Sequence, residues 1–299
     1  MTENVNPPQI HSGYKTPIIL FVQLVFIAAI ALISAYVLLP KLSPAHQGYI
    51  CDDSALKYKY RDNTIDISLV HLTGYFLLII TIFIIECQPF YGLGGAKVCP
   101  ADELPLNERL IAGSYVFFAS QLGLCMNFML YNLVKYSCGR LRPHFFDVCR
   151  PNVDCKPGTY VDSYFCTGPN DRLIRDVHLS FYSGHAATAF YYATFLTVYT
   201  QMRLRRRLLH CLPFLYMWNV LLFAAASFVG LSRISDNKHH NSDVVFGALV
   251  GITVGVTIFV YLHEILRRIR FKIYIAPENV VTLERRHFQS HLNNEPASA

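Results

Sequence analysis

Six long runs of mostly apolar residues alternate with polar segments along the chain. The hydrocarbon core of a bilayer is about 30 Å thick and requires about 20 apolar residues per helix, which is close to the length of each run. We therefore predict an all-α, polytopic membrane protein with six transmembrane helices in one bundle. The expected helices span residues 17–39, 65–85, 110–134, 180–201, 212–231 and 244–266.

The first run is longer than the apolar region of a signal peptide, and Pro40 and Lys41 follow it directly. We expect it to be retained as a membrane helix. The six helices then make one domain, residues 1–272. The polar residues 273–299 are expected to form a mobile cytoplasmic tail.

The composition agrees with a membrane protein. Hydrophobic residues make up 53% of the chain and charged residues only 15%, whereas a soluble domain carries about 25% charged residues. The net charge is +6, but there is no dense basic stripe interleaved with aromatic residues. Nucleic acid is therefore not an expected partner.

Basic residues at helix ends predict the orientation, because Lys and Arg favour the cytoplasmic side. Two basic clusters follow the fourth and sixth helices: Arg203, Arg205, Arg206 and Arg207, then Arg267, Arg268, Arg270 and Lys272. An even number of crossings puts both clusters and both termini in the cytoplasm. Residues 135–179 and 232–243 then lie outside. The first of these segments is also basic, but long loops follow the rule weakly.

Five of the nine cysteines fall in the two outer loops of this topology: Cys51, Cys138, Cys149, Cys155 and Cys166. Disulfides persist in extracytoplasmic space, so we expect at least one among them. Cys155 and Cys166 are the candidate pair because both lie between the third and fourth helices. Connectivity cannot be deduced from sequence alone, and free thiols are the alternative.

The first polar stretch with chemistry leaves the third helix at residues 135–143. Lys135 and Arg142 are seven residues apart and would share one face if the helix continues to Pro143. Two cations at a membrane surface suit a phosphate, and a guanidinium can bind two of its oxygens. The alternative is interfacial snorkelling of two long side chains.

The second stretch is Ser183-Gly184-His185, at the start of the fourth helix. Unpaired N–H groups at a helix N-terminus bind anions, and glycine allows the backbone to approach a ligand closely. His185 can transfer a proton near neutral pH. Taken alone, this tripeptide is more often a helix cap with a nearby histidine.

The third stretch links the fifth and sixth helices and contains Arg233, His239, His240 and Asp243. If a helix starts near His239, Asp243 lies one turn further on the same face. A carboxylate there can hold one imidazole nitrogen and leave the other free as a nucleophile. A metal site at His239, His240 and Asp243, and a merely solvated loop, are the alternatives.

On this topology the three stretches lie at helix ends on one side of the membrane. Phosphoryl transfer requires mainly positioning and neutralisation of three equatorial oxygens. Lys135, Arg142 and Arg233 would supply that charge without a metal. The sequence therefore favours a phosphoryl-transfer site with no cofactor.

These stretches resemble the three signature motifs of the type 2 phosphatidic acid phosphatase superfamily, K-x6-RP, SGH and SR-x5-H-x3-D. The residues around them resemble the animal lipid phosphate phosphatase branch, and the likeness covers residues 16–266. Many members of the superfamily have proline before SGH where this chain has Tyr182. That form is typical of the lipid branch.

The resemblance implies a lipid phosphomonoesterase acting on the extracellular or lumenal face. His239 would be the nucleophile that forms a phosphohistidine, Asp243 would orient it, and His185 would be the general acid and base. The phosphate would be held by Lys135, Arg142, Ser183, Gly184 and Arg233. Phosphatidate, lysophosphatidate, sphingosine 1-phosphate and ceramide 1-phosphate would be the substrates, in the plasma membrane or secretory membranes. Members of the family are reported to self-associate, which leaves a homo-oligomer open.

Two other classes of function stay open. A lipid head-group transferase of the sphingomyelin synthase kind also uses a His–Asp pair, but the K-x6-RP stretch argues against it. A non-catalytic protein that presents phospholipids to a partner would not need His185, His239 and Asp243 together.

Overall fold

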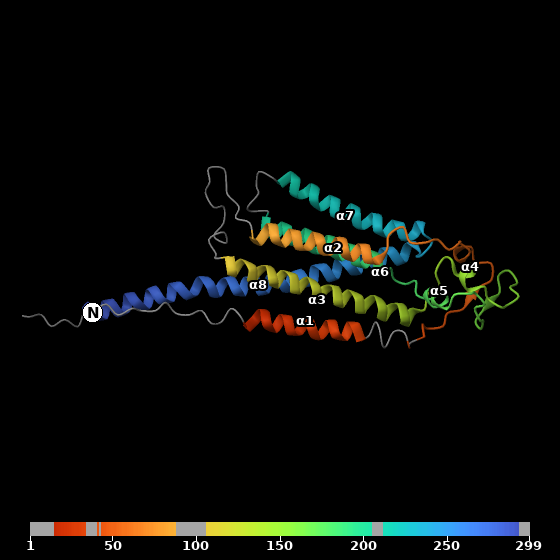
Figure 1. The fold of residues 1–299 in the computed structure, drawn as a ribbon, viewed down its shortest axis with the longest axis horizontal. Coiled ribbons are helices and arrows are strands. Elements are labelled where there is room, and N and C mark those ends of the chain that lie inside the picture. Colours follow the sequence, from red (N-terminus) through yellow and green to blue (C-terminus); the bar gives the residue numbers. More distant parts are fainter. Residues whose placement is uncertain (1–14, 34–40, 42, 88–105, 205–211, 293–299) are drawn as a thin grey trace, which may run out of the picture. The chain divides into compact units, whose positions relative to one another are not determined.

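The computed structural model describes residues 15–33, 41, 43–87, 106–204 and 212–292 (Figure 1). Apart from one two-stranded sheet, the regular elements of these residues are helices. They are α1 (Lys15–Ile33), β1 (Tyr49–Ile50), η3 (Ser54–Leu56), α2 (Ile67–Ile82), η4 (Phe83–Cys87), α3 (Leu106–Cys138), α4 (Phe145–Cys149), β2 (Tyr160–Val161), α5 (Asp171–Asp176), α6 (Gly184–Leu204), α7 (Leu212–Ser235) and α8 (Asn241–Leu292).

The six longest helices coincide with the six apolar runs, so the helical class is confirmed. Among the described residues, four helical stretches are long and apolar enough to cross a membrane: Ile67–Glu86, Arg109–Cys138, Leu212–Ser235 and Asn241–Leu266. The described part of α1 contributes a shorter apolar stretch, Phe21–Ile33. Crossing of the membrane by α1 and α6 stays a prediction.

The lower hydropathy of α6 follows from its position in the bundle. It packs against α2, α3 and α7, and thirteen of its residues are buried. A helix surrounded by protein does not face lipid and can carry more Tyr, Thr and Ala than its neighbours. Tyr191, for example, is fully buried and donates from its hydroxyl to the carbonyl of Ser120 at 2.6 Å.

Three glycines on one face of α8 allow it to approach α6 closely. Gly247, Gly251 and Gly255 are spaced four residues apart and meet the α6 backbone and Thr194. A Cβ at Gly251 would lie 2.2 Å from the carbonyl oxygen of Ala187. Small residues at this spacing are typical of tightly packed membrane helices.

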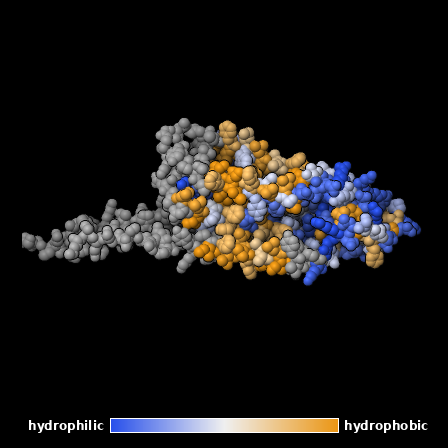
Figure 2. All heavy atoms as spheres, in the orientation of Figure 1, coloured by the Kyte–Doolittle hydropathy of each residue, from blue (hydrophilic) through white to orange (hydrophobic). Residues whose placement is uncertain are grey.

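The outer faces of the helices are apolar. Many of their large apolar side chains are more than half exposed, among them Leu72 and Phe76 on α2 and Phe214 and Val220 on α7. Figure 2 shows this apolar surface over the helices and a hydrophilic surface at the end that carries α4 and α5. Such a distribution is expected when lipid, and not water, surrounds the helices.

A buried ion pair lies at the other end of the bundle. Arg203 of α6 donates from Nε and NH2 to the two carboxylate oxygens of Glu86, at 2.7 and 2.5 Å, and Tyr199 donates to the same carboxylate. Charges within membrane helices are normally paired in this way. Of the basic cluster after the fourth expected helix, Arg205, Arg206 and Arg207 lie outside the described residues.

The loops at the hydrophilic end fold into a small cap. β1 and β2 pair antiparallel, with Tyr49 opposite Val161. Tyr49 also packs against Phe145, which is fully buried at the centre of the cap. The loop between α1 and α2 and the loop between α3 and α6 therefore form one structure.

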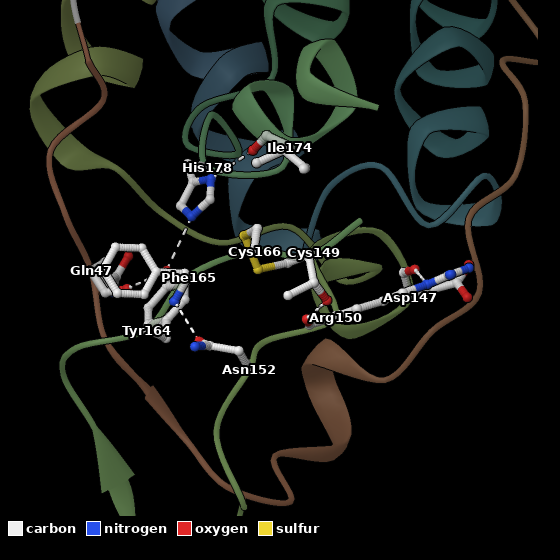
Figure 3. The surroundings of a disulfide bond; sticks show 11 residues. Gln47, Asp147, Cys149, Arg150, Asn152, Tyr164, Phe165, Cys166, Ile174 and His178 are labelled. Carbon is white, nitrogen blue, oxygen red and sulfur yellow. Dashed lines mark hydrogen bonds between the residues drawn. A yellow bond between two sulfur atoms is a disulfide. The ribbon is translucent and has the colours of Figure 1, made fainter. Parts of the chain in front are cut away.

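Two disulfides close this cap. Cys51 is bonded to Cys155. Cys149 is bonded to Cys166, as Figure 3 shows. The expectation of disulfides among the loop cysteines is thus confirmed. The predicted Cys155–Cys166 pairing is wrong, because the β1–β2 pairing brings Cys51 to Cys155 and leaves Cys166 to Cys149. Cys138 is a free, exposed thiol.

The chain forms two compact units, Met1–Phe259 and Val260–Ala299. Every residue of the site described below belongs to the first unit. The helix α8 extends to Leu292, and residues 293–299 lie outside the described residues. The expected boundary between a domain and a mobile tail at residue 272 stays a prediction.

Candidate active site

The first motif begins in the last turn of α3 and continues as a loop. α3 ends at Cys138, and Gly139 has a φ of +62° that glycine adopts without strain. A Cβ at Gly139 would lie 1.8 Å from the carbonyl oxygen of Ala45. α3 thus stops short of Pro143, so the condition for a shared face is not met and Lys135 and Arg142 do not share a helix face.

Arg142 is instead fixed by Asp176, the last residue of α5. It is buried and donates to the carboxylate of Asp176 at 2.7 Å and to the carbonyl of Asp176 at 2.9 Å. Burial opposes ionisation of Asp176, but Arg142 and Lys135 outweigh it and hold the pKa of this carboxyl below its ordinary value. Lys135 and Arg142 remain within electrostatic reach of each other.

The second motif begins α6 as expected. Ser183 is fully buried and caps the helix, since the N–H of Ala187 donates to its carbonyl at 3.0 Å. The N–H of Ser183 donates to the carbonyl of Asp243 at 3.0 Å, which ties the second motif to the third. His185 follows in the first turn, and its Nε2 is buried without a hydrogen-bond partner among the described residues.

The third motif joins α7 to α8. Arg233 lies in the last turn of α7, only 2% exposed, and its NH1 donates to Asp236 at 3.2 Å. His239 is 3% exposed, and its N–H donates to the carbonyl of Arg233 at 3.3 Å. The turn between the two helices thus places the guanidinium and the imidazole in one buried cluster.

The start of α8 is a capping arrangement built on Asp243. The helix begins at Asn241, and the Asp243 carboxylate accepts from the backbone N–H of His240 at 3.0 Å. Nδ1 of His240 lies 3.3 Å and Nδ1 of His239 lies 3.7 Å from the same oxygen. Asp243 is therefore hydrogen-bonded to His240 and faces His239 without a hydrogen bond.

Two further residues that the sequence reasoning missed hold Asp243. Arg140 donates to Oδ1 and Ser180 donates to Oδ2, each at 2.6 Å. Arg140 and Ser180 lie close in sequence to predicted site residues. Their residue types and spacing do not predict a contact with Asp243, which is about 60 to 100 residues away. Groups near all three motifs therefore meet at one fully buried carboxylate.

The loop before α2 also reaches this cluster and was not predicted to do so. The ammonium of Lys238 lies 3.5 Å from the centroid of the Tyr60 ring. Burial and nearby Arg142 lower the pKa of Lys238 to about 8. Tyr60 also makes an edge contact with His144, whose pKa burial lowers to about 4.

The predicted cations and histidines converge. Lys135 and Arg142 act electrostatically on both His185 and His239, and Arg233 also acts on His185. Burial, reinforced by Arg142 and Lys135, lowers the pKa of His239 well below its ordinary value. His239 is thus neutral at pH 7, and a neutral imidazole has the lone pair that a nucleophile needs.

Within the described residues, no three His, Cys, Asp or Glu side chains are grouped as metal ligands. At the third motif, Asp243 is already bonded to Arg140, Ser180 and His240. Lys135, Arg142 and Arg233 act electrostatically on the histidines of the site. These positive charges favour an anion over a metal ion as the ligand.

The chain is similar to known proteins. The family model described as the PAP2 superfamily matches residues 116–267. Phospholipid phosphatase 1 of Rattus norvegicus is 32% identical over 238 residues, which are 77% of this chain and 80% of that protein. A phospholipid phosphatase homologue of Caenorhabditis elegans is 35% identical over 233 residues, 75% of this chain and 68% of that protein. A crystal structure of a PAP2-type phosphatidylglycerolphosphate phosphatase from Bacillus subtilis aligns at 17% identity and a TM-score of 0.37, over 83% of this chain and 96% of that one.

Proposed function

The chain belongs to the PAP2 superfamily, and we propose that it is a membrane-embedded lipid phosphate phosphatase. It hydrolyses the phosphomonoesters of phosphatidate, lysophosphatidate, sphingosine 1-phosphate and ceramide 1-phosphate without a metal ion. The names of its relatives, phospholipid phosphatases, support the reaction class. The chemistry shared by the four substrates is a phosphate on a lipid alcohol near the membrane surface.

One observation carries this proposal above the others. Lys135, Arg142 and Arg233 act electrostatically on His185, and Lys135 and Arg142 also act on the neutral, buried His239. A phosphate bound among these cations would have its charge neutralised and would lie beside two imidazoles. Positioning and charge neutralisation are the main requirements of phosphoryl transfer.

In the first step, a lone pair of His239 attacks phosphorus and forms a P–N bond. Nε2 is the attacking atom, because Nδ1 faces Asp243 at 3.7 Å. The P–O bond to the lipid alcohol breaks, and its electron pair stays on the departing oxygen. His185 is protonated in this complex because the bound phosphate offsets the positive charge around it. It gives its proton to this oxygen, so the lipid leaves as a neutral alcohol.

In the second step, His185 accepts a proton from water. The resulting hydroxide attacks phosphorus, and the P–N bond breaks with its electrons returning to His239. Inorganic phosphate leaves, and both histidines recover their starting states. Ser183 and Gly184 at the start of α6, together with the three cations, hold the phosphate during both steps.

The site lies on the extracellular or lumenal face, with both termini in the cytoplasm, in the plasma membrane or the secretory pathway. Two disulfides in the cap beside the site support this orientation, since disulfides persist outside the cytoplasm. The cap is made of the loop between α1 and α2 and the loop between α3 and α6. The chain between these two loops contains two crossings, α2 and α3, so both loops lie on the same side of the membrane.

Purified protein in detergent, assayed for phosphate release from the four lipids in excess EDTA, tests this function. We expect release from each lipid and inhibition by vanadate, which mimics five-coordinate phosphorus. Absence of release from every lipid would contradict the proposal and favour a lipid-presenting protein. Transfer of a choline head group would favour a transferase. Loss of activity in EDTA, restored by a divalent ion, would favour a metal site.

A further inference from the structure

The connection between α1 and α2 crosses the loops that carry all three motifs. We call residues 58–66 the strap. The backbone N–H of Tyr58 donates to the carbonyl of Pro143 at 3.1 Å, and the backbone of Ile65 is hydrogen-bonded to the imidazole of His185. The strap therefore contacts the first and second motifs directly.

The strap makes its densest contacts with the third motif. From the strap, Nη1 of Arg61 donates to the carbonyl of Ser235 at 3.0 Å, and Oγ1 of Thr64 donates to the carboxylate of Asp236 at 2.6 Å. In the other direction, Nδ2 of Asn237 donates to the carbonyl of Lys59 at 2.9 Å. Nη2 of Arg233 donates to the side-chain oxygen of Asn63 at 2.9 Å. The family match begins only at residue 116, so the strap lies outside it. A segment remote in sequence thus lies over the site.

Asn63 is the strap residue that touches a catalytic cation. Its amide nitrogen donates to the carboxylate of Asp66, the residue that precedes α2, at 2.9 Å. A carboxylate cannot donate, so this bond fixes the orientation of the amide. The amide oxygen then accepts from NH2 of Arg233.

Arg233 consequently donates to two acceptors that come from different parts of the chain. Asp236 comes from its own loop and Asn63 comes from the strap. Its Nε is buried without a hydrogen-bond partner among the described residues. A guanidinium presents its donors in a rigid plane, so fixing two donors also fixes the direction of the third.

Asn63 carries no charge, so it leaves the positive charge of Arg233 available for binding an anion. Asp236 already offsets part of the positive charge of Arg233. A second carboxylate would offset more of it and would repel a phosphate. An amide oxygen holds the guanidinium in place and leaves its charge available.

We propose that Asn63 is a positioning residue that sets Arg233 for phosphate binding. This inference rests on the proposed function, in which Arg233 binds the phosphate. The strap thereby makes the start of α2 part of the active site. Substitutions at Asn63 should weaken phosphate binding through Arg233 and through no other group.

Orthovanadate binding to the purified full chain measures this directly, through the rise in melting temperature with vanadate concentration. We expect Asn63→Ala to weaken vanadate binding by about 10-fold, the loss of one hydrogen bond to a charged group. Asn63→Gln, which keeps the amide but displaces it, should also weaken binding. The matched control is Arg61→Ala, which removes a strap contact to a backbone carbonyl and touches no catalytic side chain. It should leave vanadate binding unchanged.

A double-mutant cycle shows whether Asn63 acts through Arg233. In an Arg233→Lys background, adding Asn63→Ala should weaken vanadate binding by less than about 2-fold. A full second 10-fold loss there, or equal binding by Asn63→Ala and Arg61→Ala, would overturn the inference while the phosphatase function stands. A wild-type protein that neither binds vanadate nor releases phosphate would overturn the proposed function itself. Melting temperatures without vanadate identify any variant that fails to fold.

Discussion

Arg140 donates from NH1 to the carboxylate of Asp243 at 2.6 Å, a shorter separation than that between Asp243 and either neighbouring histidine. Asp243 is fully buried, while the Arg140 side chain is 32% exposed. A buried carboxylate needs a paired cation or several donors to stay ionised. Arg140 is therefore part of the support that fixes the residue facing His239.

Replacing Arg140 tests that support. Arg140→Ala should lower kcat/KM for lysophosphatidate by about 10- to 100-fold, because Asp243 keeps only Ser180 and His240 as donors. Arg140→Lys should recover part of the loss, since an ammonium supplies the charge but not the same geometry. Arg172→Ala, at an exposed position of α5, is the control. Unchanged kcat/KM in Arg140→Ala would show that Asp243 does not need this partner.

The two histidines should respond differently to substitution. His239→Ala removes the proposed nucleophile, so phosphate release should vanish for every substrate. His185→Ala removes the proposed proton donor to the departing alkoxide, and general acid catalysis typically contributes about 10²–10⁴-fold. We therefore expect a severe loss in His185→Ala on lysophosphatidate.

An aryl phosphate separates these roles, because p-nitrophenolate is a stable anion that needs little protonation. His185→Ala should retain a larger share of wild-type activity on p-nitrophenyl phosphate than on the lipid. The assay should follow the first burst of nitrophenol, because His185 is also the proposed base for water and later turnover can stall. Equal losses in both variants on both substrates would contradict the assigned roles.

The disulfide that joins the two cap loops should contribute to stability. Cys51 and Cys155 are 104 residues apart, and loss of a native disulfide typically costs about 2–5 kcal/mol. Replacing both by serine should lower the melting temperature in detergent, whereas Cys138→Ser, at a free exposed thiol, should not. Peptide mapping without reductant should recover Cys51–Cys155 and Cys149–Cys166. A Cys155–Cys166 peptide would contradict this connectivity.

Stability should fall as the pH drops from about 6.5 to about 4. The pKa of His144 is lowered to about 4 by burial, so the unfolded chain binds a proton in this range that the folded chain does not. The difference corresponds to roughly 3 kcal/mol at most. His178 and His239, whose pKa values are also lowered by burial, add to the effect.

His144→Asn isolates the contribution of that residue. Asparagine can keep the donor that His144 Nδ1 offers to the carbonyl of Asn237 at 2.6 Å, but it does not titrate. The melting temperature of the variant should therefore change less between pH 6.5 and 4 than that of the wild type. An identical pH dependence would show that His144 takes up its proton equally in both states.

The sequence by itself predicted the helices and the chemical groups of the site. Apolar runs of membrane length are a local property, so α2, α3, α7 and α8 lie where their hydropathy put them. The motif residues were also readable, because phosphoryl transfer requires particular side chains at helix ends. His185, His239 and Arg233 were named for that reason, and the folded chain gathers them in one cluster.

Only the tertiary structure decided which groups meet across long stretches of chain. α3 ends at Cys138, and the backbone of Ala45 leaves no room for a Cβ on the next residue, Gly139. Cys155 pairs with Cys51 because two short strands from different loops align. Arg140 reaches Asp243, and Asn63 reaches Arg233, across about 100 and 170 residues. Periodicity and spacing report the geometry of one element at a time, whereas these contacts depend on how several elements pack together.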